Sequence, residues 1–169
     1  MSYIDKKERF IQAWTRYGSR WGINKTMGQL HAYLLTEMEP LCTEQIMDSL
    51  SISRGNVNMN VRHLIDWGLV KKVYLKGDRK EYFVAIKDVK EIAKRIIIQR
   101  RKKELEPLLE LMQDMNEDAD DWKDESVESL AFYELISSID KMGSQANEMI
   151  EKFLTVEEYW LVKALKKWM

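Results

Sequence analysis

Residues 43–86, TEQIMDSLSISRGNVNMNVRHLIDWGLVKKVYLKGDRKEYFVAI, carry the sequence patterns that are most informative about the fold. Its first part predicts a short helix over residues 43–50, with Thr43 as the N-cap and apolar residues on one side. A tight turn follows, and Ser53 can cap a second helix that runs to about Trp67. The apolar residues of this second helix recur at helical spacing and predict a buried stripe, which consists of Val57, Val61, Leu64 and Ile65.

The opposite side of the second helix carries polar side chains suited to base recognition. A solvated helix face usually has Glu and Lys four residues apart, and the first two turns of this helix have no such pair. Asn can form two hydrogen bonds with adenine and Arg two with guanine, and in helix-turn-helix proteins the N-terminal end of the second helix enters the major groove. For a helix in isolation, an ordinary polar face would be the simpler interpretation. The residues expected at bases or adjacent phosphates are Ser53, Arg54, Asn56, Asn58, Met59 and Arg62.

A basic hairpin follows directly. Gly68 is expected to end the second helix, because glycine readily adopts the left-handed backbone conformation. Residues 69–75 and 80–86 are rich in β-branched and aromatic side chains, and the Gly-Asp pair in residues 76–79 favours a turn between two strands. A small basic hairpin behind a helix-turn-helix is a wing, which holds phosphates or inserts an Arg into the minor groove. The wing residues expected to contact DNA are Lys76, Arg79 and Lys80.

At these residues the chain resembles a known family. Residues 53–64, SRGNVNMNVRHL, resemble the recognition helix of GbsR-type regulators, and residues 67–73 and 76–83 resemble their wing. GbsR-type regulators belong to the MarR superfamily of bacterial and archaeal transcription factors. Residues 21–35 resemble the first helix of that winged helix, so the resemblance covers less than half of the chain. It implies a homodimeric DNA-binding repressor or activator. Asn58 stands where the family more often has Ser, so the family's base preference is not carried over.

Composition and cysteine content indicate the class of protein. A chain of 169 residues is long enough for one domain with appended dimerisation helices. The single cysteine, Cys42, excludes an internal disulfide framework, and we expect a buried structural thiol rather than a redox switch. The charged N-terminus does not resemble a signal peptide, and no apolar run approaches the ~20 residues that span a membrane. We therefore expect a cytoplasmic protein without membrane contact.

The charge distribution supports a nucleic-acid partner although the net charge is −1. Residues 1–105 contain 21 Lys and Arg against 12 Asp and Glu, whereas residues 106–169 contain 6 against 16. Such an asymmetry suggests a part that faces nucleic acid and an acidic part turned away from it. Chance segregation of charge on a solvated surface is the alternative, and it is the weaker one because the wing lies in the basic half.

Residues 1–22 predict an N-terminal dimerisation helix with large aromatic side chains. Phe10, Trp14, Tyr17 and Trp21 recur at steps of four, three and four, which is a heptad-like seam. The resemblance to GbsR-type regulators also implies sensing of a small effector such as choline or betaine, which aromatic cages bind through cation–π contacts. The candidate effector-binding residues are Trp14, Tyr17, Trp21 and Tyr33. Packing in the core and in a dimer interface explains the same side chains, and we favour it.

Residues 89–169 predict a C-terminal helical dimerisation or effector region. Pro107 should kink or restart the helix that follows the wing, because proline removes a backbone hydrogen bond. The acidic residues 116–125 predict a loop, and residues 126–154 predict another helix. Thr155 would open a capping box for a last helix. The apolar face of that last helix includes Leu161, Leu165 and Trp168.

These patterns together predict a mainly α fold with a small β-wing, in which residues 23–88 form a winged helix-turn-helix domain flanked by dimerisation helices. One cysteine and two distant histidines, His31 and His63, cannot build a typical zinc site, and no phosphate loop or nucleophile elbow is present. We expect neither an enzyme nor a protein with a metal or cofactor. The expected function is that of a homodimeric transcriptional regulator, most simply a repressor, on a pseudo-palindromic operator in double-stranded DNA. The alternative is a winged-helix module for protein–protein assembly, with the acidic C-terminal half as its docking surface.

Overall fold

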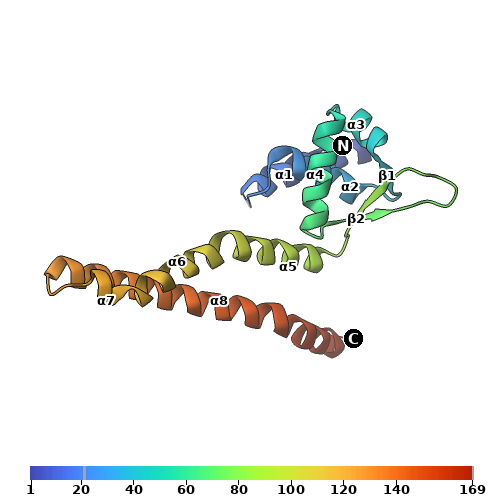
Figure 1. Cartoon of the computed structure of the whole chain (residues 1–169). Helices are drawn as coiled ribbons and strands as arrows, with labels where there is room; N and C mark the ends of the chain where they lie inside the picture. Colours follow the sequence, from blue (N-terminus) through green and yellow to red (C-terminus); the bar gives the residue numbers. More distant parts are fainter. Residues whose placement is uncertain (21, 169) are drawn as a thin grey trace. The chain divides into compact units, whose positions relative to one another are not determined.

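The computed structural model describes the backbone of residues 1–20 and 22–168, and the side chains of these residues apart from Asp121 and residues 156–168. The chain divides into two compact units, residues 1–99 and 100–169. Helices predominate, and the strands form one small antiparallel sheet in the first unit (Figure 1). The predicted mainly α class with a small β-wing is therefore confirmed.

The first unit contains the predicted N-terminal helix and the helix-turn-helix. In chain order its first four helices are α1 (Tyr3–Arg20), α2 (Lys25–Thr36), α3 (Thr43–Leu50) and α4 (Arg54–Asp66). α1 packs closely on α2: a Cβ atom added to Gly28 would lie only 3.5 Å from the backbone of Thr15. Cys42, and not Thr43 as predicted, is the N-cap of α3, and its N–H donates to the Oε1 of Gln45 at 2.9 Å.

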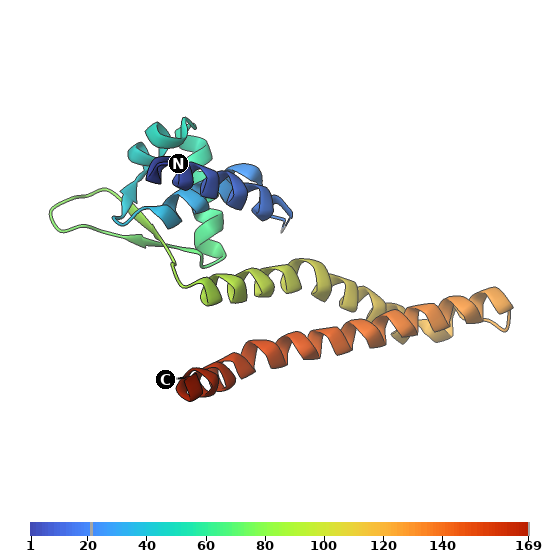
Figure 2. The ribbon, with the colours of Figure 1, turned by 180° about the vertical axis from the view of Figure 1, so that it is seen from behind.

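The sheet has three strands, one more than the two predicted from the sequence. β1 (Leu41–Cys42) pairs with β3 (Tyr82–Ala85), and β3 pairs with β2 (Val70–Val73), so the spatial order is β1-β3-β2. All pairs are antiparallel, with Leu41 opposite Phe83 and Val73 opposite Tyr82. β2 and β3 are shorter than expected, and the connection between them forms a long loop that extends away from the helices (Figure 2).

One continuous core holds the helix-turn-helix against the sheet. Every residue of the predicted stripe on α4 is packed in it, although Ile65 is only partly buried. The side chains with less than 2 % exposure come from α2, α3, α4 and β2 and the residue before β2. The large apolar members are Leu30, Leu34, Ile46, Val57, Val61, Leu64, Leu69 and Val70. Burial of this kind stabilises a fold by roughly 1.5–3 kcal/mol per large apolar side chain, so the orientation of α4 is set by its own apolar face.

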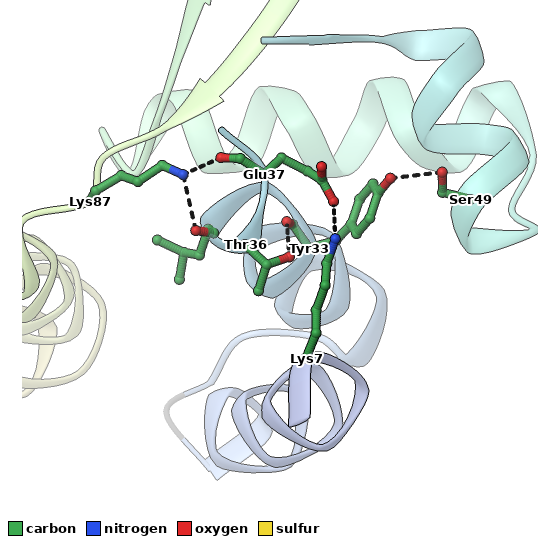
Figure 3. Close-up of polar contacts among 7 residues, drawn as sticks. Lys7, Tyr33, Thr36, Glu37, Ser49 and Lys87 are labelled. Atoms are coloured by element: carbon green, nitrogen blue, oxygen red, sulfur yellow. Dashed lines mark hydrogen bonds and ion pairs between the residues drawn. The ribbon is translucent and has the colours of Figure 1, made fainter. Parts of the chain in front are cut away.

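Two lysines hold the C-terminal end of α2, where carbonyl groups lack helical partners (Figure 3). The Lys87 ammonium, which follows the wing, donates hydrogen bonds to the carbonyl oxygens of Leu35, at 3.1 Å, and Glu37. The carboxylate of Glu37 pairs with Lys7 of α1. A cation at a helix C-terminus also interacts favourably with the helix dipole. These contacts join α1, α2 and the end of the wing into one body.

The second unit is helical throughout its regular structure. Its elements are the last residue of α5 (Val89–Arg100), a π-helical turn (Arg101–Leu105), α6 (Glu106–Glu117), α7 (Ala119–Trp122) and α8 (Val127–Trp168). α8 runs back along α6 in both views (Figures 1 and 2).

Pro107 restarts the helix as expected: it lies in the first turn of α6, where its missing N–H costs little, directly after the π-helical turn. Two other expectations for the second unit are corrected. The predicted loop at residues 116–125 is shortened by the end of α6 and by α7. Thr155 does not open a new helix, because α8 continues through it and its hydroxyl donates to the Glu151 carbonyl at 2.9 Å. The predicted apolar face at Leu161, Leu165 and Trp168 lies outside the described side chains.

Candidate nucleic-acid interface

α4 presents the predicted polar face to solvent. The Ser53 hydroxyl accepts a hydrogen bond from the Asn56 N–H at 3.3 Å, so Ser53 is the N-cap as expected. The apolar stripe turns inward and leaves the other side of the helix outside the core. All six α4-region residues predicted to reach DNA are exposed, namely Ser53, Arg54, Asn56, Asn58, Met59 and Arg62. This face has the hydrogen-bonding groups that base-edge recognition requires.

A buried asparagine on α4, which the sequence interpretation missed, fixes the helix against α2. Asn60 is fully buried, its Nδ2 donates to the Asn56 carbonyl at 2.8 Å, and its Oδ1 accepts from the Nδ2 of Asn24 at 3.0 Å. Asn24 is also the N-cap of α2, since its Oδ1 accepts from the Met27 N–H at 2.8 Å. One amide therefore links the start of α2 to the middle of α4. The position of Asn60, three residues after Val57, could have revealed its burial, but its partner is not visible in the sequence.

The C-terminal end of α4 is held by a residue from α5. Gly68 has φ +71°, the left-handed conformation predicted for it, and its N–H donates to the Ile65 carbonyl at 2.8 Å. The guanidinium of Arg95 donates to the carbonyl of Gly68 and pairs with Glu91 at 2.6 Å. Both ends of α4 are therefore capped, and its exposed face is carried on a fixed frame.

The wing carries its cations on a loop organised by two carboxylates. Lys72 of β2 pairs with Glu81 at 2.9 Å, across the base of the loop. The carboxylate of Asp78 accepts from the Lys80 N–H at 2.9 Å and from the Tyr82 hydroxyl at 2.8 Å. These donors lower the pKa of Asp78, the Lys80 N–H most strongly. Lys76, Arg79 and Lys80, the predicted wing contacts, are all exposed.

One acidic residue, absent from the sequence prediction, lies between α4 and the wing. Glu44 is in the first turn of α3, and its Oε1 accepts from the Nη2 of Arg54 at 2.6 Å. Its Oε2 lies 3.9 Å from the Nζ of Lys80. Hydrogen bonds from its own backbone N–H and from Arg54 lower the pKa of Glu44 to about 2. Arg54, which is expected at a base or an adjacent phosphate, is therefore held by a carboxylate in the free protein.

The described members of the predicted aromatic cage have separate neighbours. The Trp14 Nε1 donates to the Nδ1 of buried His31 at 3.2 Å, and Tyr17 lies beside Arg20. The Tyr33 hydroxyl donates to the Ser49 hydroxyl of α3 at 2.8 Å, as Figure 3 shows. Trp21 lies outside the described residues.

An open groove of about 590 Å³ lies between α1 and α2. Its lining includes Arg16 and Lys25, which would repel a cationic ligand. The cage stays a prediction, and calorimetry with choline and glycine betaine tests it.

Other kinds of site find little support in the described part of the chain. Cys42 is buried and is the N-cap of α3, as a structural thiol would be. No cluster of three or more His, Cys, Asp or Glu side chains that could hold a metal ion occurs among the described residues. Within the same residues, none of the helices combines the length and apolar character that crossing a membrane requires.

Comparisons with known proteins point to transcriptional regulators. No family model matches the sequence. The HTH-type transcriptional regulator MmpR5 of Mycobacterium tuberculosis is 28% identical over 75 residues, which are 44% of this chain and 46% of MmpR5. The match thus spans about half the length of that curated relative. A crystal structure described as that of a transcriptional regulator superposes with a TM-score of 0.68 at 17% identity, over 90% of this chain and 98% of the other. This superposition establishes a shared fold.

Proposed function

We propose that this chain is a DNA-binding transcriptional regulator of the winged-helix type. The observation that carries the proposal is the exposed polar face of α4 next to a basic wing on the same compact unit. The similarity to MmpR5, an HTH-type transcriptional regulator, supports it. Occupying a promoter excludes other proteins from it, so repression is the mode of action that we propose. The narrower assignment to GbsR-type regulators remains a prediction.

The two parts of this surface would have different roles. The N-terminal half of α4 would enter the major groove, where Asn56 and Asn58 can bond base edges and Arg62 can bond a guanine or a phosphate. The wing would lie over the adjacent backbone or minor groove, with Lys76 and Arg79 as its cations. Base contacts carry sequence preference, and phosphate contacts carry affinity for any sequence.

We also propose that the regulator acts as a homodimer formed through α8. The helix carries an apolar seam at alternating steps of three and four residues, the repeat of a helix that packs on a partner helix. Leu135, Met142 and Met149 in this seam are 54%, 68% and 71% exposed. The full seam is Phe132, Leu135, Ile139, Met142, Ala146, Met149 and Phe153.

A second copy of the chain is the occupant that fits this seam. A different side of α8, with Ile136, Gly143 and Leu154, already faces α6 or lies buried within the unit. Two equivalent seams can pack on each other about a two-fold axis, as most homodimers do. A two-fold dimer also supplies the two reading heads that a pseudo-palindrome requires.

Two variants test the separate roles at the DNA surface. Asn58→Ala should lower affinity for an operator selected from a random library by about 10-fold, the cost of one good base contact. It should leave affinity for a random duplex nearly unchanged. Arg79→Ala should weaken binding to both duplexes and lower the salt slope, because a lost phosphate contact releases fewer counterions. If both variants bind both duplexes as the wild type does, the assigned surface is wrong.

A second pair of variants tests the dimer. Met142→Glu places a charge in the middle of the seam and should give a monomer by sedimentation velocity at micromolar concentration. Ser144→Glu adds the same charge at an exposed position outside the seam and should leave the dimer intact. A wild-type monomer would contradict the dimer. If the seam binds a different protein and the chain does not bind duplex DNA, the alternative function as a protein–protein assembly module would be established instead.

A further inference from the structure

The ion pairs at Glu44 lie in the surface assigned above to DNA. Arg54 is the first residue of α4, Lys80 belongs to the wing loop, and Glu44 belongs to α3. The side chains of Glu44, Arg54 and Lys80 are 42%, 59% and 56% exposed. Two cations from different elements therefore share one carboxylate, which is exposed to solvent.

Two other cations of the wing have no carboxylate partner in the described part of the chain. Among the described side chains, Lys76 and Arg79 have no carboxylate oxygen within 4.0 Å of their cationic nitrogens. Arg54 and Lys80 are thus the members of the candidate interface that pair with Glu44. A glutamate carboxylate is charged at physiological pH.

We propose that Glu44 occupies the anionic position that a DNA phosphate takes in the complex and so opposes binding to non-specific DNA. A phosphate that approaches Arg54 or Lys80 must displace this carboxylate or lie beside it, and like charges at that distance repel. The same cost applies to DNA of any sequence, because phosphate contacts carry no sequence information. Glu44 therefore lowers affinity for all duplexes, so that tight binding depends on base contacts by α4. The inference rests on the proposed DNA-binding function.

The decisive experiment compares Glu44→Gln with Glu148→Gln by anisotropy on a labelled random duplex at several salt concentrations. Glutamine keeps the size of the side chain and removes its charge. Glu148 pairs with Lys152 on α8, so its variant makes the same change of net charge outside the candidate interface. Glu44→Gln should bind about three- to tenfold more tightly at low salt, with a steeper negative salt slope, because each freed cation that reaches a phosphate adds about 0.9 to its magnitude. Glu148→Gln should bind like the wild type.

A double-variant cycle identifies the group through which Glu44 acts. In an Arg54→Gln background, Glu44→Gln should gain less affinity than it does alone, because the main partner of the carboxylate is already absent. On a selected operator, the gain from Glu44→Gln should be similar to that on the random duplex, because the phosphate contact is common to both. Melting temperatures verify folding, and Glu44→Ala should show the same gain as Glu44→Gln.

The outcomes separate this inference from the function on which it rests. Wild-type binding with an equal or weaker Glu44→Gln variant overturns the role of Glu44 and leaves the DNA-binding proposal standing. An equal gain in Glu148→Gln would reduce the effect to net charge and also overturn it. If neither wild type nor variant binds any duplex at the lowest salt, both the function and the inference are wrong.

Discussion

The two units of this chain bury their apolar side chains to very different degrees. In residues 1–99, one core encloses most of the large apolar residues of α2, α3, α4 and the sheet. In residues 100–169, α8 turns one apolar side inward and leaves a second seam exposed along several turns. The first unit thus contains the partners for its own core, whereas the second has an apolar surface that a second copy would cover.

The units also differ in charge. Residues 1–99 contain 17 Lys and Arg against 11 Asp and Glu, and residues 100–169 contain 10 against 17, so the balances are +6 and −7. A basic unit attracts polyanions, and an acidic one repels them. The charge difference matches the division of labour proposed from burial, with DNA on the first unit and self-association on the second.

The largest expected change in stability distinguishes a substitution in the enclosed core from one in the exposed seam. Leu64→Ala should destabilise the protein by about 3 kcal/mol, because the side chain is fully buried and a cavity remains. Met142→Ala should instead lower the melting temperature more at high protein concentration than at low, since its contacts would form between copies and stabilise only the dimer. Thermal melts over a hundredfold range of concentration measure both. A concentration-independent effect of Met142→Ala would contradict the seam's role.

A pH effect of intermediate size is expected from the core of the first unit. Burial lowers the pKa of His31 from 6.5 to about 4. Above pH 6.5 the folded and unfolded chains both hold neutral imidazole. Below it only the unfolded chain gains the proton, so stability falls as the pH drops toward 4. Urea unfolding should show a loss of about 2 kcal/mol between pH 7 and 5.

The control for this pH effect is His31→Gln, which removes the titrating group and keeps an acceptor for Trp14. Its unfolding free energy should change much less over the same interval, whatever its value at pH 7. An equal pH dependence in the variant would assign the loss to other groups. The same interval lies above the normal carboxylate range, so acid titration of Asp and Glu contributes little.

A smaller difference in unfolding free energy is expected between substitutions of two left-handed glycines within the first unit. Gly68→Ala should cost about 2 kcal/mol, from backbone strain and from displacement of Arg95, whose guanidinium would clash with the new Cβ. Gly77→Ala, at φ +87° in the wing loop with open space around it, should cost about half as much. Urea denaturation measures both. Equal costs would show that Arg95 does not hold the end of α4.

The smallest effect concerns the N-cap of α4. Ser53→Ala removes the acceptor for the Asn56 N–H and should cost about 1 kcal/mol. Ser53→Asp keeps an acceptor and should retain stability, but it adds a negative charge to the face proposed to meet DNA. The pair therefore separates folding from binding when melting and anisotropy are measured together. Loss of stability in both variants would contradict the cap.

The sequence predicted the helix-turn-helix because its signals are local. The spacing of Val57, Val61 and Leu64, the cap at Ser53 and the glycine at position 68 each act within a few residues, and the structure confirms all of them. The strand β1 was missed because two residues after a proline carry no periodicity. They become a strand only through pairing with β3, which is distant in sequence.

The long helix α8 was divided wrongly because a capping-box pattern is ambiguous inside a helix. Thr155 has a carbonyl oxygen of the preceding turn within reach, and its hydroxyl donates to that carbonyl rather than capping a new helix. The predicted site residues share one exposed region because they lie on one helix face and one hairpin. The ion pairs of Glu44 could not be predicted, because α3, α4 and the wing meet there only in the folded chain.

The DNA-binding function is tested most directly by the salt dependence of binding between the whole chain and a labelled random duplex. A winged helix that neutralises several phosphates should bind tightly at low salt and lose affinity with a slope of about −0.9 per contact on a double-logarithmic plot. A slope of −3 or steeper, reduced by about one in Arg79→Ala, is the result that we predict. No binding by the folded protein at the lowest salt concentration would contradict the DNA-binding function.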